Sequence, residues 1–175
     1  MVVFDSSFLI PLLDENARSD VPQGKVKVQY LLTELMNAKD VVGVPTPALA
    51  EFLVKIEPAA RNKYLKILTS SARFRIIPFD TLAAVEVAEQ IAVAVANGDK
   101  RSGVKGDWPK VKFDRQIIAV AQVSGATRIY SHDPDFKTLV GTGGMQVINL
   151  DDLPLPPTGD QLEIDLGEEQ DQGGN

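Results

Sequence analysis

The 175-residue sequence contains no cysteine and a single histidine. No disulfide framework can therefore stabilise the fold, and a zinc site is not expected, because zinc prefers sulfur and imidazole ligands. Any metal would have to accept oxygen ligands, which favours Mg²⁺ or Mn²⁺. No apolar run approaches the roughly 18 residues of a membrane span, and the opening MVVFDSSFLI lacks the basic leader of a secretory signal. We therefore expect a cytoplasmic protein.

Basic residues are missing from one end of the chain. Residues 151–175 contain eight acids and no Lys or Arg, and they are rich in proline and glycine. This composition is typical of disorder, so we expect residues 1–150 to form the domain and residues 151–175 to form an acidic, disordered tail. The whole chain carries a net charge of −6, but residues 1–150 hold 16 acids and 18 bases, a net +2. A mildly basic body permits binding to a phosphate backbone.

Short apolar segments alternate with helical patterns along the body of the chain. Apolar runs with β-branched residues predict strands at 2–4, 41–44, 74–79, 128–131 and 145–150. Apolar residues at helical spacing predict helices at 6–14, 25–38, 46–56, 59–71, 81–96 and 113–124, and a short one beginning near Pro134. The alternation predicts one α/β domain with a central, mostly parallel sheet flanked by helices.

Two local patterns set the expected helix starts in more detail. Thr46-Pro47 predicts an N-cap followed by a proline at the first helical position of the helix 46–56. Asp80 or Thr81 is expected to cap the helix 81–96. Residues 98–111, which contain glycine and many charges, are expected to form a loop. This loop would place Asp114 at the opening of the helix that follows.

Acidic residues are expected near the edge of the sheet where the strands end. Asp5 ends the first strand, and Asp133 follows the strand RIYS. Glu51 lies one turn into the helix after the second strand, and Asp114 opens a later helix. Ligands of open α/β sheets collect outside the carboxyl ends of the strands. Clustered carboxylates repel one another, and a divalent cation is the simplest reason to assemble them. Such a site can activate water and stabilise charge on a phosphate.

Each of these acids also has a purely structural interpretation. Asp5 could cap the first helix, and Glu51 could be an ordinary exposed helical glutamate. Asp114 could be an N-cap or a first-turn acid favoured by the helix dipole. Asp133 stands directly before a proline, which is a strong capping pattern that can coexist with metal binding.

Three further features have alternative interpretations. His132 could act as a general base, although a surface or hydrogen-bonded histidine is the more ordinary role, because an activated water needs no imidazole. Trp108 could stack on a nucleic-acid base, or it could pin its loop to the body. The acidic tail could be a solubilising end, or it could lie over the basic loop and compete with RNA.

Four segments of the sequence together resemble the PIN domain family and, within it, the VapC-like toxin ribonucleases. VVFDSSFLI resembles the opening strand with its Asp-x-Ser, and VPTPALAEFL resembles the second motif. FDRQIIAVAQVSGA resembles the third motif and IYSHDPDF the fourth. The matching residues are Asp5 and Ser7, Thr46 and Glu51, Asp114, and Ser131 with Asp133 and the extra acid Asp135.

The resemblance implies an endoribonuclease that depends on Mg²⁺ or Mn²⁺, often dimeric and often restrained by a cognate antitoxin. It implies that Asp5, Glu51, Asp114 and Asp133 are the catalytic, metal-binding acids, with Asp133 or Asp135 as the last ligand. Ser7, Thr46 and Ser131 would orient ligands or water. RNA would be bound by the crowded bases Lys100, Arg101, Lys105, Lys110, Lys112 and Arg115.

Two other functions fit parts of the sequence. A non-catalytic PIN-like module that binds RNA or protein would have no need to keep four acids. A metal-dependent phosphatase of another α/β class would explain DSSF after the first strand, but its usual Asp-x-Asp motif is missing because residue 7 is serine.

Overall fold

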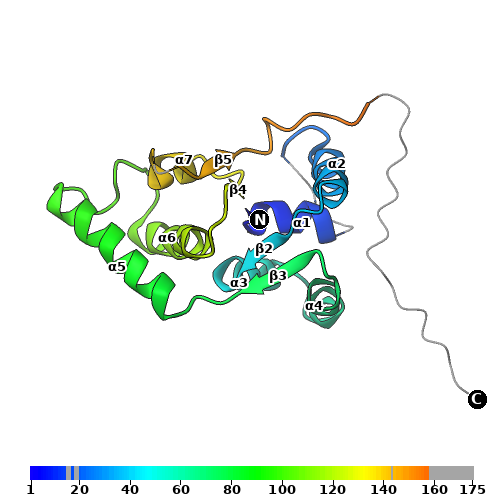
Figure 1. The fold of residues 1–175 in the computed structure, drawn as a ribbon, viewed down its shortest axis with the longest axis horizontal. Helices are drawn as coiled ribbons and strands as arrows, with labels where there is room; N and C mark the ends of the chain where they lie inside the picture. The colour runs from blue at the N-terminus through cyan, green and yellow to red at the C-terminus, as the bar shows by residue number, and fades with distance from the viewer. Residues whose placement is uncertain (15–16, 18–19, 143, 158–175) are drawn as a thin grey trace, which may run out of the picture.

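Five short strands, all parallel, form the sheet at the centre of the computed structural model (Figure 1). The structure describes residues 1–14, 17, 20–142 and 144–157. The strand order is β3-β2-β1-β4-β5, with β1 Val2–Phe4, β2 Val42–Pro45, β3 Phe74–Ile77, β4 Arg128–Tyr130 and β5 Gln146–Ile148. The predicted α/β fold with a central parallel sheet is confirmed.

Helices make every connection between the strands. The helices are α1 Ser6–Leu13, α2 Gly24–Asn37, α3 Thr46–Lys55, α4 Arg61–Ser70, α5 Thr81–Ala96, α6 Trp108–Val123 and α7 Asp135–Val140, with a short 3₁₀ turn at Pro58–Ala60 before α4. Within the described part of the chain, no helix combines the length and hydrophobicity that a membrane span needs.

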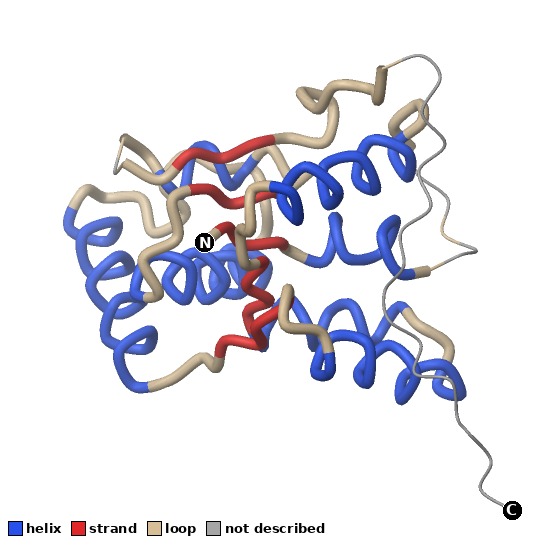
Figure 2. The backbone as a smooth tube through the Cα atoms, turned by 45° about the vertical axis from the view of Figure 1, so that its right-hand side comes forward, coloured by secondary structure: helices blue, strands red, loops and turns tan. Residues whose placement is uncertain are grey.

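The central strand β1 separates two hydrophobic cores. Val2 and Phe4 face one core, which they share with side chains of α1, α2, α3 and α4. Val3 faces the other core, which it shares with α6 and α7. All three residues are fully buried, as expected of a parallel strand covered on both faces. Figure 2 shows the helices gathered on the two sides of the strands.

The order of the strands places a topological switch point beside β1. The chain leaves β1 to build β2 and β3 on one side, and then returns to build β4 and β5 on the other. Connections therefore diverge at the carboxyl ends of β1 and β4. In open α/β sheets this crevice is the usual binding place for ligands.

Two of the predicted helix starts are wrong. Helix α6 begins at Trp108, not at Phe113, because Asp107 caps it by accepting a hydrogen bond from the Lys110 N–H at 2.9 Å, with Pro109 in the first turn. Asp114 therefore lies in the second turn of α6 and neither caps nor opens the helix. Thr46 is already helical and follows the cap residue Pro45.

The chain keeps its contacts with the body beyond residue 150. Leu153 is buried in the same core as Val2, and the Asp151 carbonyl accepts a hydrogen bond from Lys27 at 3.1 Å. The predicted disordered tail begins at residue 151, so residues 151–157 of it are described, and the remainder from 158 onward lies outside the described residues.

Candidate active site

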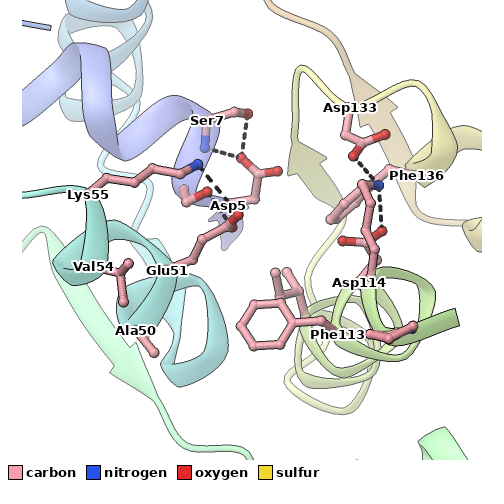
Figure 3. Close-up of a pocket in the computed structure, with 14 residues that line it drawn as sticks. Asp5, Ser7, Ala50, Glu51, Val54, Lys55, Phe113, Asp114, Asp133 and Phe136 are labelled. Atoms are coloured by element: carbon pink, nitrogen blue, oxygen red, sulfur yellow. Dashed lines mark hydrogen bonds and ion pairs between the residues drawn. The ribbon is translucent and has the colours of Figure 1, made fainter. Parts of the chain in front are cut away.

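A pocket of about 610 Å³ lies at the carboxyl ends of the strands, at the switch point between β1 and β4. This volume falls within the range of about 300–1,000 Å³ that is usual for ligand sites. Its polar lining includes all four predicted acids, together with Lys55 and Lys110; Val54, Phe113, Ile117 and Phe136 add apolar surface. Figure 3 shows Asp5 and Glu51 on one side of the pocket and Asp114 and Asp133 on the other.

Asp5 is held at the end of β1 by three hydrogen bonds. Its Oδ1 accepts from the Ser7 N–H at 2.7 Å, which caps α1, and from the Ser7 hydroxyl at 2.5 Å. Its Oδ2 accepts from the Ser131 hydroxyl at 2.5 Å, directly after β4. Both carboxylate oxygens are therefore fixed by residues from the two sides of the switch point. The capping interpretation of Asp5 is correct, and capping leaves the carboxylate on the pocket wall.

Glu51 comes to the same wall from helix α3. Its Oε2 accepts a hydrogen bond from the Ser6 hydroxyl at 2.5 Å, and its Oε1 lies 3.4 Å from the Lys55 ammonium. The second of these is an i,i+4 pair on the helix surface and contributes little energy by itself. The contact with Ser6 is what directs the carboxylate toward α1 and the pocket.

On the opposite wall, three carboxylates surround one ammonium group. The Lys110 Nζ lies 2.9 Å from Asp114 Oδ2, 2.5 Å from Asp133 Oδ2 and 3.4 Å from Asp135 Oδ2. Lys110 reaches Asp114 because the two residues are one turn apart on α6. The segment after β4 brings Asp133, whose Oδ1 accepts from the Asp135 N–H at 2.9 Å.

Burial makes the two innermost acids harder to ionise. Asp5 is 5% exposed, and its burial raises the pKa to about 6, helped by the negative charge of Glu51 and opposed by the bonds from Ser131 and Ser7. Burial also raises the pKa of Asp114 to about 6, and the charges of Asp133 and Asp5 add to this effect, while Lys110 opposes it. Both carboxylates would gain from a nearby cation.

Comparison with known proteins identifies the family. The model of the PIN domain matches residues 2–141, most of the chain. The chain belongs to the PIN domain family. A search of curated protein sequences finds no match.

Solved structures share this PIN fold at low sequence identity. The VapBC2 complex of Rickettsia felis, bound to a DNA fragment from its promoter, superposes with a TM-score of 0.58 at 16% identity over 85% of this chain and 98% of the other. The FitAB complex bound to an IR36 DNA fragment gives 0.58 at 20% identity over 88% and 98%. Mycobacterium tuberculosis VapC20, a toxin that cleaves the sarcin-ricin loop, gives 0.50 at 18% identity over 78% and 93%.

The carboxylates of this PIN domain have the oxygen ligands that a hard divalent cation prefers. Their side chains are, however, too far apart to bind one together as they stand. Oxygen ligands are what Mg²⁺ and Mn²⁺ prefer, and burial raises the pKa of both Asp5 and Asp114, an effect that a nearby cation would offset. Among the described residues, however, no three Asp, Glu or His side chains converge closely enough to hold a metal. Serine hydroxyl groups bind Asp5 and Glu51, with Lys55 also beside Glu51, and Lys110 binds the other acids. The donor set therefore fits the metal after a side-chain adjustment.

The three supporting residues have different surroundings. Ser7 and Ser131 both donate to Asp5, and Ser131 also accepts from the Asp133 N–H at 3.1 Å. The Thr46 hydroxyl instead accepts from the Phe79 N–H at 2.9 Å. Thr46 thus ties the start of α3 to the segment after β3, and its hydroxyl is not bonded to any of the acids.

The predicted RNA-binding bases divide into three groups. Lys100, Arg101, Lys105 and Lys112 are exposed on or beside the loop before α6, and Lys100 and Lys112 lie 5.1 and 5.7 Å from the centre of the Trp108 ring. Lys110 lies among the acids. Arg115 is only 3% exposed and donates to Ser102 at 2.7 Å, so its predicted contact with RNA does not fit its position.

Trp108 and His132 both have partners within the protein. Trp108 packs at the edge of the core that contains Val3, which favours the interpretation that it pins the loop. The His132 Nδ1 lies 2.9 Å from the Asn149 side-chain oxygen, and His132 does not line the pocket. A general-base role for His132 has no support in this geometry.

The sequence alone does not place three polar residues in the pocket: Ser6, Lys55 and Lys110. Ser6 stands beside Ser7, but adjacent residues at a helix start point to different partners. Lys110 is grouped with the RNA-binding bases because it lies in a segment crowded with Lys and Arg. The spacing of four residues between Lys110 and Asp114, together with Asp107 as the cap, could have placed it.

Proposed function

We propose that the chain is a metal-dependent endoribonuclease that hydrolyses RNA phosphodiester bonds, and that it acts as the toxin of a toxin–antitoxin pair. One observation carries the proposal: four acids from separate segments of a PIN domain line one pocket at the switch point of its sheet. The similarity of the fold to VapC20 and the VapBC complexes agrees with it.

The acids would act as ligands of Mg²⁺ or Mn²⁺. Asp5, Glu51, Asp114 and Asp133 would hold the metal, with Asp135 beside them. The bound metal would activate a water molecule and stabilise negative charge on the phosphate. Ser7 and Ser131 keep both oxygens of Asp5 in place, so this ligand needs little reorganisation.

Other residues of the pocket would bind the nucleotide. Lys55 is a cation on the pocket wall that can approach a phosphate. Phe113, which is only partly buried, offers apolar surface for a ribose or a base. The exposed Lys100, Arg101, Lys105 and Lys112 would extend the contact along the RNA backbone.

We also propose that the domain has a protein partner, either a second copy or an antitoxin. Helix α5 exposes large apolar side chains, including Leu82, Val85 and Val93, and exposed apolar surface of this kind is typical of an interaction site. The VapBC and FitAB neighbours are themselves complexes. An RNA substrate, a partner protein and Mg²⁺ or Mn²⁺ are therefore the expected ligands.

The test is cleavage of a mixed pool of structured RNAs in Mn²⁺ by the wild type, Asp114→Asn and the control Asp20→Asn, which changes an exposed acid. All three proteins must first give the same near-UV circular dichroism. We expect cleavage by the wild type and the control but not by Asp114→Asn. Equal cleavage by all three would contradict the assignment of Asp114.

The same experiment separates the alternative functions. Binding of RNA without cleavage by any protein would favour a non-catalytic module. Turnover of a small phosphate ester with no RNA cleavage would favour a phosphatase.

A further inference from the structure

We propose that Lys110 is a built-in competitor of the divalent cation: its ammonium occupies the acid cluster until the metal displaces it, and it then turns to the phosphate of the substrate. This inference rests on the proposed metal-dependent nuclease. It assigns Lys110 to the pocket itself, separate from the exposed bases of the loop. Without the metal, Lys110 positions the carboxylates of the cluster. With the metal bound, Lys110 contacts the substrate.

The contacts of Lys110 involve the oxygens that a metal would need. Its Nζ lies 2.9 Å from Asp114 Oδ2 and 2.5 Å from Asp133 Oδ2. These two oxygens would be ligands of a divalent cation on this wall, and two cations that share the same oxygens repel each other. An ammonium in contact with both oxygens therefore opposes the binding of the divalent cation.

The charge of the cluster explains why a divalent metal can displace the ammonium of Lys110. Asp114, Asp133 and Asp135 contribute three negative charges when ionised, and one ammonium leaves a net charge of −2. A divalent cation in its place leaves a net charge of −1, so it neutralises one more negative charge than the ammonium does. A simple structural ion pair would need only one carboxylate, and an i,i+4 pair with Asp114 already provides it.

The surroundings of Lys110 allow its ammonium to move toward the open pocket. A Cβ added at Gly106 would lie 3.0 Å from Asp135 Oδ2 and 3.4 Å from Lys110 Cδ, so the loop closes the cluster on that side. The Lys110 side chain is 41% exposed and lines the pocket. Its flexible four-carbon stem can therefore turn into the open pocket, where the phosphate of the substrate would lie.

The first test measures Mn²⁺ binding by isothermal titration calorimetry, on the full chain at constant ionic strength. The variants are Lys110→Met, which removes the charge, Lys110→Arg, which keeps it, and Lys66→Met, which removes an exposed charge on α4. We expect Lys110→Met to bind Mn²⁺ about fivefold more tightly than the wild type, the factor for one partly screened ion pair. The other two variants should bind like the wild type.

A second measurement does not depend on the folding of Lys110→Met. In ¹⁵N-labelled wild type, the ammonium resonance of Lys110, assigned from its loss in Lys110→Arg, should shift when Mg²⁺ saturates the protein. The ammonium resonance of Lys66 should not shift. An unchanged Lys110 resonance at saturation would overturn the displacement.

The outcomes distinguish this inference from the proposed function. If the wild type binds Mn²⁺ and cleaves RNA, but Lys110→Met binds Mn²⁺ equally or more weakly, only the competition is refuted. If Lys110→Met binds Mn²⁺ more tightly and neither protein cleaves RNA, the competition stands and the ribonuclease assignment falls. If no variant binds Mn²⁺, both fall.

Discussion

Replacing Asp5 by asparagine should make the protein more stable at pH 7 in EDTA while removing its activity. The side chain is 5% exposed, and its pKa is about 6 in the fold against an ordinary 3.8. Each pKa unit corresponds to about 1.4 kcal/mol, so ionised Asp5 costs the fold up to about 3 kcal/mol. Asparagine is neutral, its side-chain oxygen can still accept from Ser7, and its NH₂ group can donate to the Ser131 oxygen, so it should recover about 1–3 kcal/mol.

The dependence on pH follows from the sign of the shift. The pKa of Asp5 is raised in the fold, so the folded protein binds this proton more tightly than the unfolded chain. The advantage of Asp5→Asn should therefore be absent below about pH 4, grow between pH 4 and 6, and be complete above pH 6.

Urea unfolding at pH 7 and pH 4 in EDTA measures this difference, with Asp20→Asn as the exposed control. Saturating Mn²⁺ should reverse the order at pH 7, because a bound metal stabilises the wild type and loses a ligand in the variant. If Asp5→Asn is less stable than the wild type by more than about 1 kcal/mol at pH 7 in EDTA, the hydrogen bonds of the ionised carboxylate outweigh its burial. The reasoning would then be refuted.

Three further perturbations test the surroundings of the site. Ser131→Ala should cost about 1–2 kcal/mol in urea unfolding, because it leaves Asp5 Oδ2 and the Asp133 N–H without a partner, and it should lower kcat more than it changes KM. Lys105→Ala should reduce the slope of log affinity for single-stranded RNA against log salt by about 0.7, and an unchanged slope would exclude a phosphate contact. Val93→Glu, at a side chain 61% exposed, should leave unfolding within about 0.5 kcal/mol of the wild type but abolish a dimer in light scattering, if α5 is the interface.

The sequence was informative where local pattern and tertiary structure agree. The apolar run at β1 followed by Asp5, and the strand β4 followed by Ser131 and Asp133, predicted which residues lie at the carboxyl edge. The capping role of Asp80 was also correct, since its side chain accepts from the Ala83 N–H at 3.0 Å. These features depend on neighbours within a few residues, which the sequence displays directly.

The parts that the sequence did not reveal depend on contacts between distant segments. The order of the strands, which places β1 between β2 and β4, has no local pattern. The contact between Ser6 and Glu51 joins residues 45 positions apart. Lys110 is difficult to place from the sequence for two reasons: the cap of its helix, Asp107, lies in a charged segment that resembles a loop, and two of its three carboxylate partners come from the segment after β4.

The carboxylates on the two walls of the pocket have different partners. A bound metal would therefore change the electrostatic surroundings of the two walls differently. On the wall of Asp5 and Glu51, serine hydroxyl groups donate to both carboxylates, and the Lys55 ammonium approaches Glu51, so among the described residues no cation is paired with Asp5. On the wall of Asp114, an ammonium already supplies positive charge. A divalent ion between the walls would therefore add charge where Asp5 lacks it and exchange charge where Lys110 provides it. For this reason Asp5→Asn and Lys110→Met should change Mn²⁺ affinity in opposite directions.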